Sequence, residues 1–399
     1  MQSEHVTQPG GRRRPRFPTL MLLLLLGSIG GLLALLHPTV RTQLLRLQYW
    51  TADWRTALLS PSTTANHDRI AVILLDPNSA PDRVCYLPIP RDYTAQVIRT
   101  VSEAGAAIIG MDFYFVQATD PEKDKVLKET MRNTNNLVLG AVNEHLKQFG
   151  ARQFAYQQAF LAEVGKPAAD VTLAFDQDNV RRSTYPPNRD AKYPETFARM
   201  IARMAGAQIE NVPPSTRTGW LWGPNNNPYP FKTVYAQELM PGERNAPQLL
   251  EQIKGKIVLI GLGFPYFDQH RTPLSVLTGE DMLGVMVHGQ MIAQLLDGRI
   301  YSELPRAQLM AFLVGVLVFG LVLSWIFWRH ASLLGQGVAA VALVSLDAVL
   351  FYWWRIYLPL APALYVWFLA VMIGSSFRTL VDWAGERRAF RREMAAQAG

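Results

Sequence analysis

Three apolar runs in the last quarter of the chain constrain its fold more than any other feature. They cover residues 308–328, 331–354 and 358–377. Each run is about twenty residues or longer, which is enough for an α-helix to cross the hydrocarbon core of a bilayer. Neighbouring runs are separated by only two or three residues, so the turns between them must be tight. The runs therefore predict three transmembrane helices packed side by side.

The stretch just before these runs, residues 255–304, has a different pattern. Residues 256–260 are apolar after Lys256 and mostly β-branched and are followed by glycines, which is typical of a strand buried on both faces. Residues 285–296 carry apolar residues at helical spacing and end at Gly298. The first membrane run begins four residues after Leu304. A soluble α/β unit is therefore expected to join the membrane with almost no linker.

A fourth apolar run lies near the N-terminus. Residues 19–36 contain no charge and follow a basic tail, residues 1–18, that holds four arginines. A cleaved signal peptide is the alternative, but the apolar part is long and no small-x-small cleavage site follows it. We therefore expect an uncleaved transmembrane helix with its N-terminus in the cytoplasm, by the positive-inside rule.

This orientation makes residues of about 40–305 periplasmic and returns the C-terminus to the cytoplasm after the three later helices. The tail of residues 378–399 is basic, which agrees with a cytoplasmic position. The expected location is the bacterial inner membrane, with four spans and membrane lipid as a partner. Because the arginine clusters flank the membrane runs, topology explains the net charge of +7, and no nucleic-acid partner is expected.

The exported region, residues 41–306, alternates strand and helix patterns. An amphipathic helix over 41–60 is expected to lead away from the membrane. Such alternation predicts a three-layer α/β domain with a largely parallel sheet and right-handed crossovers. The expected strands are 69–75, 106–115, 137–142, 171–175, 220–222 and 256–260, and the expected helices are 92–104, 120–133, 193–206 and 285–296.

No enzyme signature is found in the chain. The serine-elbow, P-loop and zinc-protease motifs are absent, and the glycines at 261 and 263 lack the third glycine of a dinucleotide fingerprint. The single cysteine, Cys85, allows no intramolecular disulfide and no cysteine-rich metal site. We expect no catalytic residue, cofactor or metal, and no hydrolase or transferase activity from the 41–306 fragment.

Ligands of a parallel sheet collect at the carboxyl ends of its strands. The side chains and glycine expected at that edge are Asp76, Arg91, Asp112, Gly261, Asp268, His270 and Arg271. They are candidate ligand-binding residues. The alternative is that Asp76 and Asp112 cap turns and pair with Arg91 or Arg271.

Three further features have both a structural and a functional interpretation. His288 is expected to be a hydrogen-bonded, partly buried histidine rather than a metal ligand, with pH sensing as the alternative. Asp347 is an intramembrane carboxylate, for which helix packing or an oligomer contact is favoured over proton transport. Its candidate partners are Ser324, Gln336 and Ser345. Gly27 and Gly31 permit close helix contact.

Several segments together resemble the type-two CHASE sensor domain over about residues 45–305. The matching segments are 73–76 (ILLD), 88–93 (PIPRDY), 104–113 (AGAAIIGMDF), 176–182 (DQDNVRR), 223–224, 255–261 (GKIVLIG), 268–273 and 284–289 (GVMVHG). The sequence departs from the family pattern at Ile89, where a tryptophan is usual, and in the loop of residues 261–268.

The resemblance implies one N-terminal helix, an exported sensor and three packed membrane helices, usually followed by a cyclase or kinase output domain. This sequence has about twenty residues after its last membrane run, so no output domain of its own is expected. The predicted function is a sensor subunit, a homodimer or part of a complex, that couples a ligand or partner outside to a separate cytoplasmic protein. The alternative is a structural or assembly subunit that docks through its exported domain.

Overall fold

The computed structural model describes residues 19–34, 37–77, 87–144, 149–184, 186–264, 266–326 and 329–398. The expected basic tail of residues 1–18 and Cys85 lie outside the described residues. The chain divides into two compact units. The sheet unit comprises Ala52–Ser302 and Phe351–Ile356, and the helical unit comprises Met1–Thr51, Glu303–Leu350 and Tyr357–Gly399.

A six-stranded sheet forms the centre of the sheet unit, with strand order β4-β3-β2-β6-β1-β5. All of its strand pairs are parallel, as the alternating pattern predicts. The strands are β1 (Ile70–Leu75), β2 (Ile108–Met111), β3 (Leu137–Ala141), β4 (Ala168–Asp170), β5 (Lys232–Tyr235) and β6 (Ile257–Leu262). Every residue of β1 is buried, because both faces of a central parallel strand are covered by helices.

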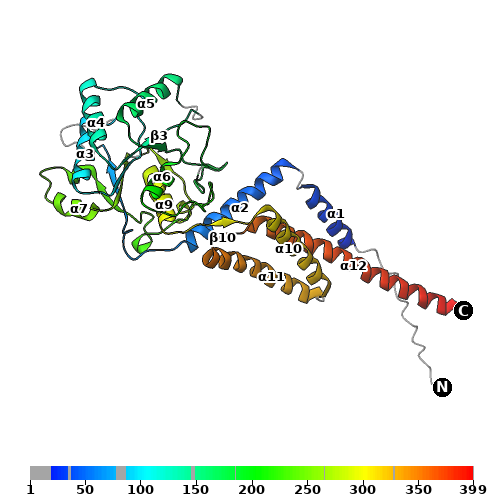
Figure 1. The fold of residues 1–399 in the computed structure, drawn as a ribbon. Helices are drawn as coiled ribbons and strands as arrows, with labels where there is room; N and C mark the ends of the chain where they lie inside the picture. The colour runs from blue at the N-terminus through cyan, green and yellow to red at the C-terminus, as the bar shows by residue number, and fades with distance from the viewer. Residues whose placement is uncertain are drawn as a thin grey trace, which may run out of the picture. The chain divides into compact units, whose positions relative to one another are not determined.

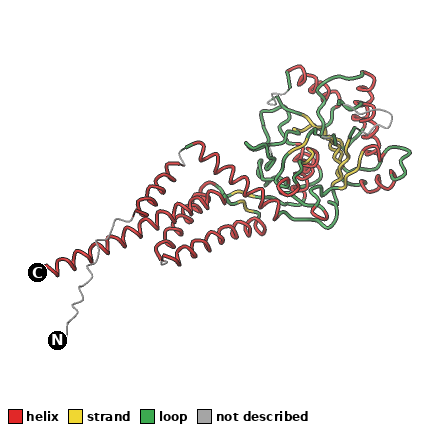
Figure 2. The backbone as a smooth tube through the Cα atoms, turned by 180° about the vertical axis from the view of Figure 1, so that it is seen from behind, coloured by secondary structure: helices red, strands yellow, loops and turns green. Residues whose placement is uncertain are grey.

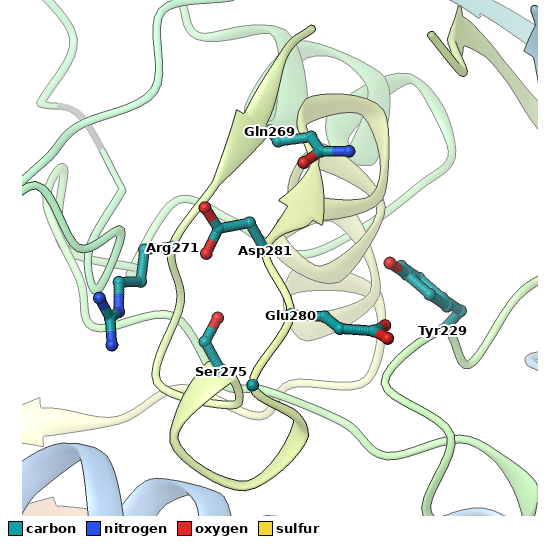
Figure 3. A pocket seen from close by; sticks show the side chains of 7 residues that line it. Tyr229, Gln269, Arg271, Ser275, Glu280 and Asp281 are labelled. Atoms are coloured by element: carbon teal, nitrogen blue, oxygen red, sulfur yellow. The ribbon is translucent and has the colours of Figure 1, made fainter. Parts of the chain in front are cut away.

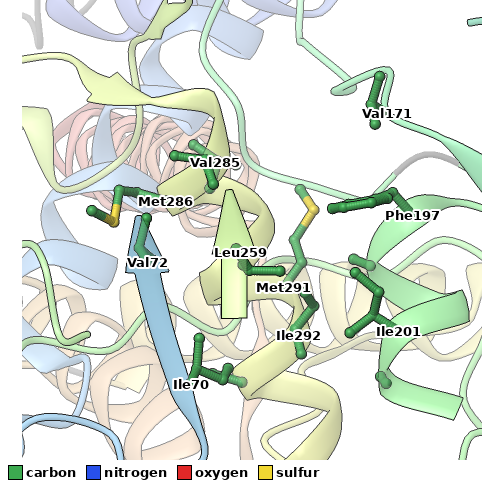
Figure 4. Packing of buried hydrophobic residues seen from close by; sticks show 14 of the residues in the cluster. Ile70, Val72, Val171, Phe197, Ile201, Leu259, Val285, Met286, Met291 and Ile292 are labelled. Atoms are coloured by element: carbon green, nitrogen blue, oxygen red, sulfur yellow. The ribbon is translucent and has the colours of Figure 1, made fainter. Parts of the chain in front are cut away.

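Helices cover both faces of the sheet, which makes three layers (Figures 1 and 2). One face packs against α3 (Arg91–Glu103), α4 (Pro121–Asn133), α5 (Ala151–Val164) and α7 (Ala246–Ile253). The other packs against α6 (Phe197–Met204) and α9 (Gly284–Leu296). Figure 4 shows this second core, where Leu259 of β6 lies among Val285 and Met291 of α9 and residues of α6.

The structure corrects several predictions in the exported region. Strand β2 ends at Met111, so Asp112 lies just beyond it rather than in its C-terminal half. Residues 171–175 and 220–222 are not strands, and the edge strand is instead the three-residue β4. Helices α5 and α7 and strand β5 were not predicted. Their apolar positions are few or interrupted by polar residues, so the periodicity signal is weak there.

The helical unit contains the predicted apolar runs. Three of its helices are long and apolar enough to cross a membrane, within the described part of the chain. The unit includes α1 (Thr19–Ala34), the first part of α2 (Pro38–Leu59), α10 (Arg306–Ile326), α11 (Arg329–Val349) and α12 (Leu360–Ala398). A π-helical turn, η3 (Leu350–Trp354), follows α11 and belongs to the sheet unit from Phe351 on. Helix α12 continues without a break from the last apolar run into the basic tail.

Small residues mediate the packing of these helices. Tyr365 of α12 donates a 2.8 Å hydrogen bond to the carbonyl of Gly31, and a side chain at Gly27 would collide with Met372. Glycines thus let α1 approach α12 closely, as the small-residue spacing predicts. Gln336 donates to Ser324 Oγ at 2.9 Å, so two of the expected partners of Asp347 bond to each other. Asp347 itself is buried.

Candidate functional site

A cavity of about 700 Å³ opens at the carboxyl edge of the sheet. The ends of β2, β6 and β1 lie level there, since Met111 is in register with Ile260 and Leu75 with Leu262. Strand β6 leads to α9 on one face, whereas β1 and β2 lead to α3 and α4 on the other. Connections that diverge to opposite faces leave a crevice, the usual position of ligands in such sheets.

Four of the seven predicted site residues line this carboxyl-edge cavity, namely Arg91, Asp112, Asp268 and His270. Gly261 does not, because it packs against α9. A Cβ at Gly261 would collide with Val285, so the glycine allows the close approach of β6 and α9. Asp76 is buried at the end of β1, beside Gly263, and lines neither cavity described here.

Arg271 faces a second hollow of about 540 Å³, with Gln269, Glu280 and Asp281 (Figure 3). Figure 3 shows Glu280 extending toward Tyr229, and Asp281 lying on the side of Arg271. Residues 268–271 therefore split between two sites: Asp268 and His270 face one, Gln269 and Arg271 the other. Gln269 and His270 form strand β7, in which successive side chains point to opposite sides.

Asp112 and His288 meet at the floor of the carboxyl-edge cavity. Asp112 Oδ1 lies 3.6 Å from His288 Nε2, and that nitrogen is 3.0 Å from the carbonyl oxygen of Val171. The carbonyl only accepts, so Nε2 carries the hydrogen. Burial lowers the pKa of His288 to about 4, which keeps the ring neutral near neutral pH and argues against the alternative of pH sensing there. His288 thus bonds α9 to the end of β4, in agreement with the expected structural role.

Burial, reinforced by the negative charge of Asp268, raises the pKa of Asp112 well above its ordinary value. Asp112 pairs with neither Arg91 nor Arg271 in the structure, contrary to the turn-capping alternative for this residue. Its backbone N–H donates to Ile260 at 2.9 Å, which fixes the loop after β2 to the end of β6.

Asp268 belongs to a chain of three polar side chains at the rim of the cavity. His270 Nε2 lies 2.9 Å from Asp268 Oδ1, and Arg181 Nη2 lies 3.2 Å from His270 Nδ1. The Asp268 carboxylate also lies against the first turn of α9, where a Cβ at Gly284 would collide with it. Arg181 stacks over Phe175, with its guanidinium carbon 4.6 Å from the ring centre.

Arg91 has a structural role at the opposite rim. Its guanidinium donates to Asp124 at 3.2 Å and to the carbonyl of Gln117 at 3.2 Å, and it stacks on Phe115. Asp124 also accepts bonds from the backbone and hydroxyl of Thr119. These bonds hold the β2–α4 loop against the start of α3, so Arg91 shapes the wall of the cavity.

The residue after Arg181 anchors the helix that leads from the membrane run. Arg182, 3% exposed, forms two 2.7 Å bonds to Asp53 of α2 and contacts Asp176 and Asp178 at 2.9 and 2.7 Å. Burial alone would lower the pKa of Arg182, but the hydrogen bonds to these carboxylates outweigh it and raise the pKa. Arg181, Arg182 and Asp53 are not among the residues that the sequence predicts for the site. The one signal in the sequence is that both arginines belong to the family-like segment 176–182.

A second anchor in the sheet unit involves the segment between the last two membrane runs. Phe351 packs against Tyr301, with ring centres 4.9 Å apart, and Arg55 of α2 lies over the ring of Phe351 at 5.2 Å. Arg355 donates to the carbonyl of Gly298 at 2.6 Å, and Ser302 donates to Arg355 at 2.9 Å. The sheet unit thus contains parts of α2, of the α9–α10 connection and of this later segment.

A parallel α/β domain with an edge cavity, joined in one chain to apolar helices of membrane-crossing length, defines a membrane protein of the sensor class. The comparisons identify the family. The model of the CHASE2 domain matches residues 22–327, so the chain belongs to the CHASE2 family. Comparisons with curated proteins and with solved structures each gave no match. The CHASE2 domain and the C-terminal apolar helices together fit a membrane sensor.

Proposed function

We propose that this protein is a non-enzymatic membrane sensor that binds a small ligand in the carboxyl-edge cavity. A single observation carries the proposal: a cavity of about 700 Å³ at the edge of the sheet where connections diverge. This volume lies within the range of small-molecule sites, and the position is the usual ligand site of such sheets. An apolar docking face for a protein partner would not need such a cavity, so the sensor is favoured over the assembly subunit.

The proposed topology has four membrane helices, with both termini in the cytoplasm and residues of about 40–305 in the periplasm of a bacterial cell. Helix α1 supports a fourth span, because it carries no charged residue, is mostly apolar and packs closely against α12. Alkaline phosphatase fused after residue 60, 300 or 356 of truncated chains should be active, and alkaline phosphatase fused after residue 330 or 392 should be inactive. Activity after residue 392 would contradict this topology.

The proposed coupling route begins with neighbouring residues on one segment. Arg181 faces the cavity, and Arg182 binds Asp53 of α2. A ligand that favours one arrangement of this segment would shift α2, provided it binds two states of the protein unequally. Helix α12 supports an output on the cytoplasmic side, since it extends past its apolar part as one basic helix. A protein partner or second copy of the chain would receive the signal there.

The binding proposal is tested with the full-length chain purified in detergent. Native mass spectrometry and thermal shift with a metabolite library should identify a stabilising small molecule. Val116→Trp, which places a large ring in the cavity, should abolish the stabilisation. Val126→Trp is the matched control, because Val126 is exposed on α4 and does not line the cavity. Equal stabilisation of both variants, or a stoichiometric protein partner in place of any small molecule, would contradict the proposal.

A further inference from the structure

We infer that the ligand of the carboxyl-edge cavity is a small organic cation, an amine attached to an apolar or aromatic body. The inference rests on the proposed function, since it concerns the same cavity. It names the ligand class from the charges and surfaces that line the site.

The first observation is that two carboxylates in the cavity have no cationic partner in contact. Among the described residues, neither Asp112 nor Asp268 forms an ion pair with an arginine or lysine. Their nearest titratable neighbours are histidines. His288 donates Nε2–H to Val171, and its buried ring is neutral. His270 accepts from Arg181 at Nδ1 and presents Nε2–H to Asp268.

The two arginines that line the cavity form hydrogen bonds with other residues and not with Asp112 or Asp268. Arg91 is bonded to Asp124 and Gln117 and stacked on Phe115. Arg181 is bonded to His270 and to the carbonyl of Leu173. The first turn of α9 beside Asp268 offers only a partial positive charge. The charged form of Asp112, whose side chain is 7% exposed, is costly without a full counter-charge, so the site favours a positive group that arrives with the ligand.

The electrostatics of two neighbouring groups agree with a missing cation. Burial and the charge of Asp268 raise the pKa of Asp112. Burial and both carboxylates also raise the pKa of Tyr114, which lines the same cavity. A bound ammonium group would lower both values, because it favours the charged forms.

The second, independent observation is an unpartnered nitrogen on a buried side chain. His288 lines the cavity and is 3% exposed, and its Nδ1 has no hydrogen-bond partner among the described residues. Because Nε2 carries the hydrogen, Nδ1 presents a lone pair and can only accept. An ammonium N–H satisfies this acceptor, whereas a carboxylate or phosphate oxygen would face it with another lone pair.

The walls of the cavity fit the rest of such a molecule. Five aromatic side chains line it: Phe113, Tyr114, Phe115, Phe175 and Phe267. Phe175 is 61% exposed and lies under the guanidinium of Arg181. Aromatic faces bind apolar groups and attract cations. No group of three or more metal-binding side chains occurs within the described residues, so an organic cation is favoured over a metal ion.

Three probes of similar size but different charge test the ligand class. Phenethylamine, 2-phenylethanol and 3-phenylpropionate are titrated calorimetrically into the full-length protein in detergent at pH 7. The amine should bind at least tenfold more tightly than the alcohol and the acid. Tighter binding of the acid or the alcohol, or no detectable binding of the amine, would overturn the inference.

Two isosteric variants locate the effect. Asp268→Asn should weaken amine binding at least tenfold and leave the alcohol unchanged, and Asp112→Asn should act in the same direction. Asp281→Asn, in the separate hollow of Figure 3, is the matched control and should leave amine binding unchanged. If Asp268→Asn fails to fold, Asp112→Asn decides alone. Amine binding that is insensitive to both variants would overturn the inference.

The proposed function has a different mode of failure. If the acid or the alcohol binds most tightly and Val116→Trp abolishes that binding, the cavity is a ligand site but not a cation site. If a metabolite stabilises Val116→Trp as strongly as the natural protein, the cavity is not the ligand site at all.

Discussion

Two clusters of aspartates lie in the same domain, and they differ in what faces them. Asp53, Asp176 and Asp178 surround one buried arginine, Arg182, at 2.7–2.9 Å. Asp112 and Asp268 lie beside His288 and His270 instead, at 3.6 and 2.9 Å. The first cluster contains its own cation, Arg182, and fixes α2 to the domain. The second lies in a cavity and contacts no arginine or lysine among the described residues, as the proposed cation site requires.

The contrast shows how neighbouring residues can serve different purposes. Arg181 and Arg182 are adjacent, yet one stacks on Phe175 at the cavity and the other is enclosed by carboxylates. Substitution of Arg181 is therefore expected to affect ligand binding, and substitution of Arg182 is expected to affect stability. The predictions below test this difference, beginning with the largest effect.

Arg182→Met should be the most destabilising change. Removing the cation leaves Asp53 buried without its partner, which typically costs about 3–5 kcal/mol of unfolding free energy. Denaturant unfolding of the full-length chain in detergent measures the loss. Arg203→Met is the control, since its ion pair with Glu195 is exposed and should be worth less than about 1 kcal/mol. Similar losses in the two variants would show that the buried cluster is not an anchor.

His288→Gln should change the acid sensitivity of the protein. The pKa of His288 is about 4 in the folded state and 6.5 as the ordinary value, so the unfolded state binds more protons between these values. The natural protein therefore loses stability as the pH falls from 6.5 to 4, on the order of 3 kcal/mol. Glutamine can still donate to Val171 but does not titrate. Melting temperatures measured from pH 4 to 7 should fall less steeply for the variant.

Asp112 should make the stability of the protein depend on pH in the opposite direction, and Asp112→Asn should remove this dependence. The pKa of Asp112 is raised above 3.8, so the folded state binds more protons than the unfolded state just above that pH. The natural protein then loses stability as the pH rises from 3.8 toward the raised pKa, at up to about 1.4 kcal/mol per pH unit. The stability of the variant relative to the natural protein should grow over this range. A constant difference would mean that Asp112 titrates normally.

Arg181→Gln should have the smallest effect on stability. It removes a half-exposed stack on Phe175 and a bond to His270, worth about 1 kcal/mol. It should also tighten phenethylamine binding severalfold, because a positive charge near Asp268 is lost. Calorimetry of this variant beside Arg182→Met compares the two adjacent arginines directly. Weaker amine binding would mean that Arg181 contacts the ligand.

Part of this arrangement could be predicted from local patterns. Strands such as Ile70–Leu75 and Ile257–Leu262 are continuous apolar runs, and a parallel sheet follows from their alternation with helices. The same reasoning placed Asp112, Asp268 and His270 at the carboxyl edge, where the cavity lies. It failed for residues 171–175 and for α5, whose patterns are short or mixed.

The separation of the site residues could not be predicted, because it depends on the direction of each side chain. Residues 268–271 were one candidate cluster in the sequence, but alternation along β7 divides them between two hollows. Gly261 was a candidate contact and is instead a point of close packing between β6 and α9. The direction of a side chain in a short strand is set by what the strand packs against, not by its own residues.

The sequence by itself determined the membrane runs, the parallel α/β class and the family. These follow from length, hydropathy and periodicity, which are local properties of the sequence, because a strand buried on both faces must be apolar along its length. Only the tertiary structure decided which charges meet. Asp53 and Arg182 are 129 residues apart and pair because α2 packs beside the segment that follows β4. Among the described residues, Asp112 and Asp268 contact no such cation, for the same reason. Which buried charge finds a partner depends on the packing of elements that are distant in the sequence, so local sequence patterns cannot predict it.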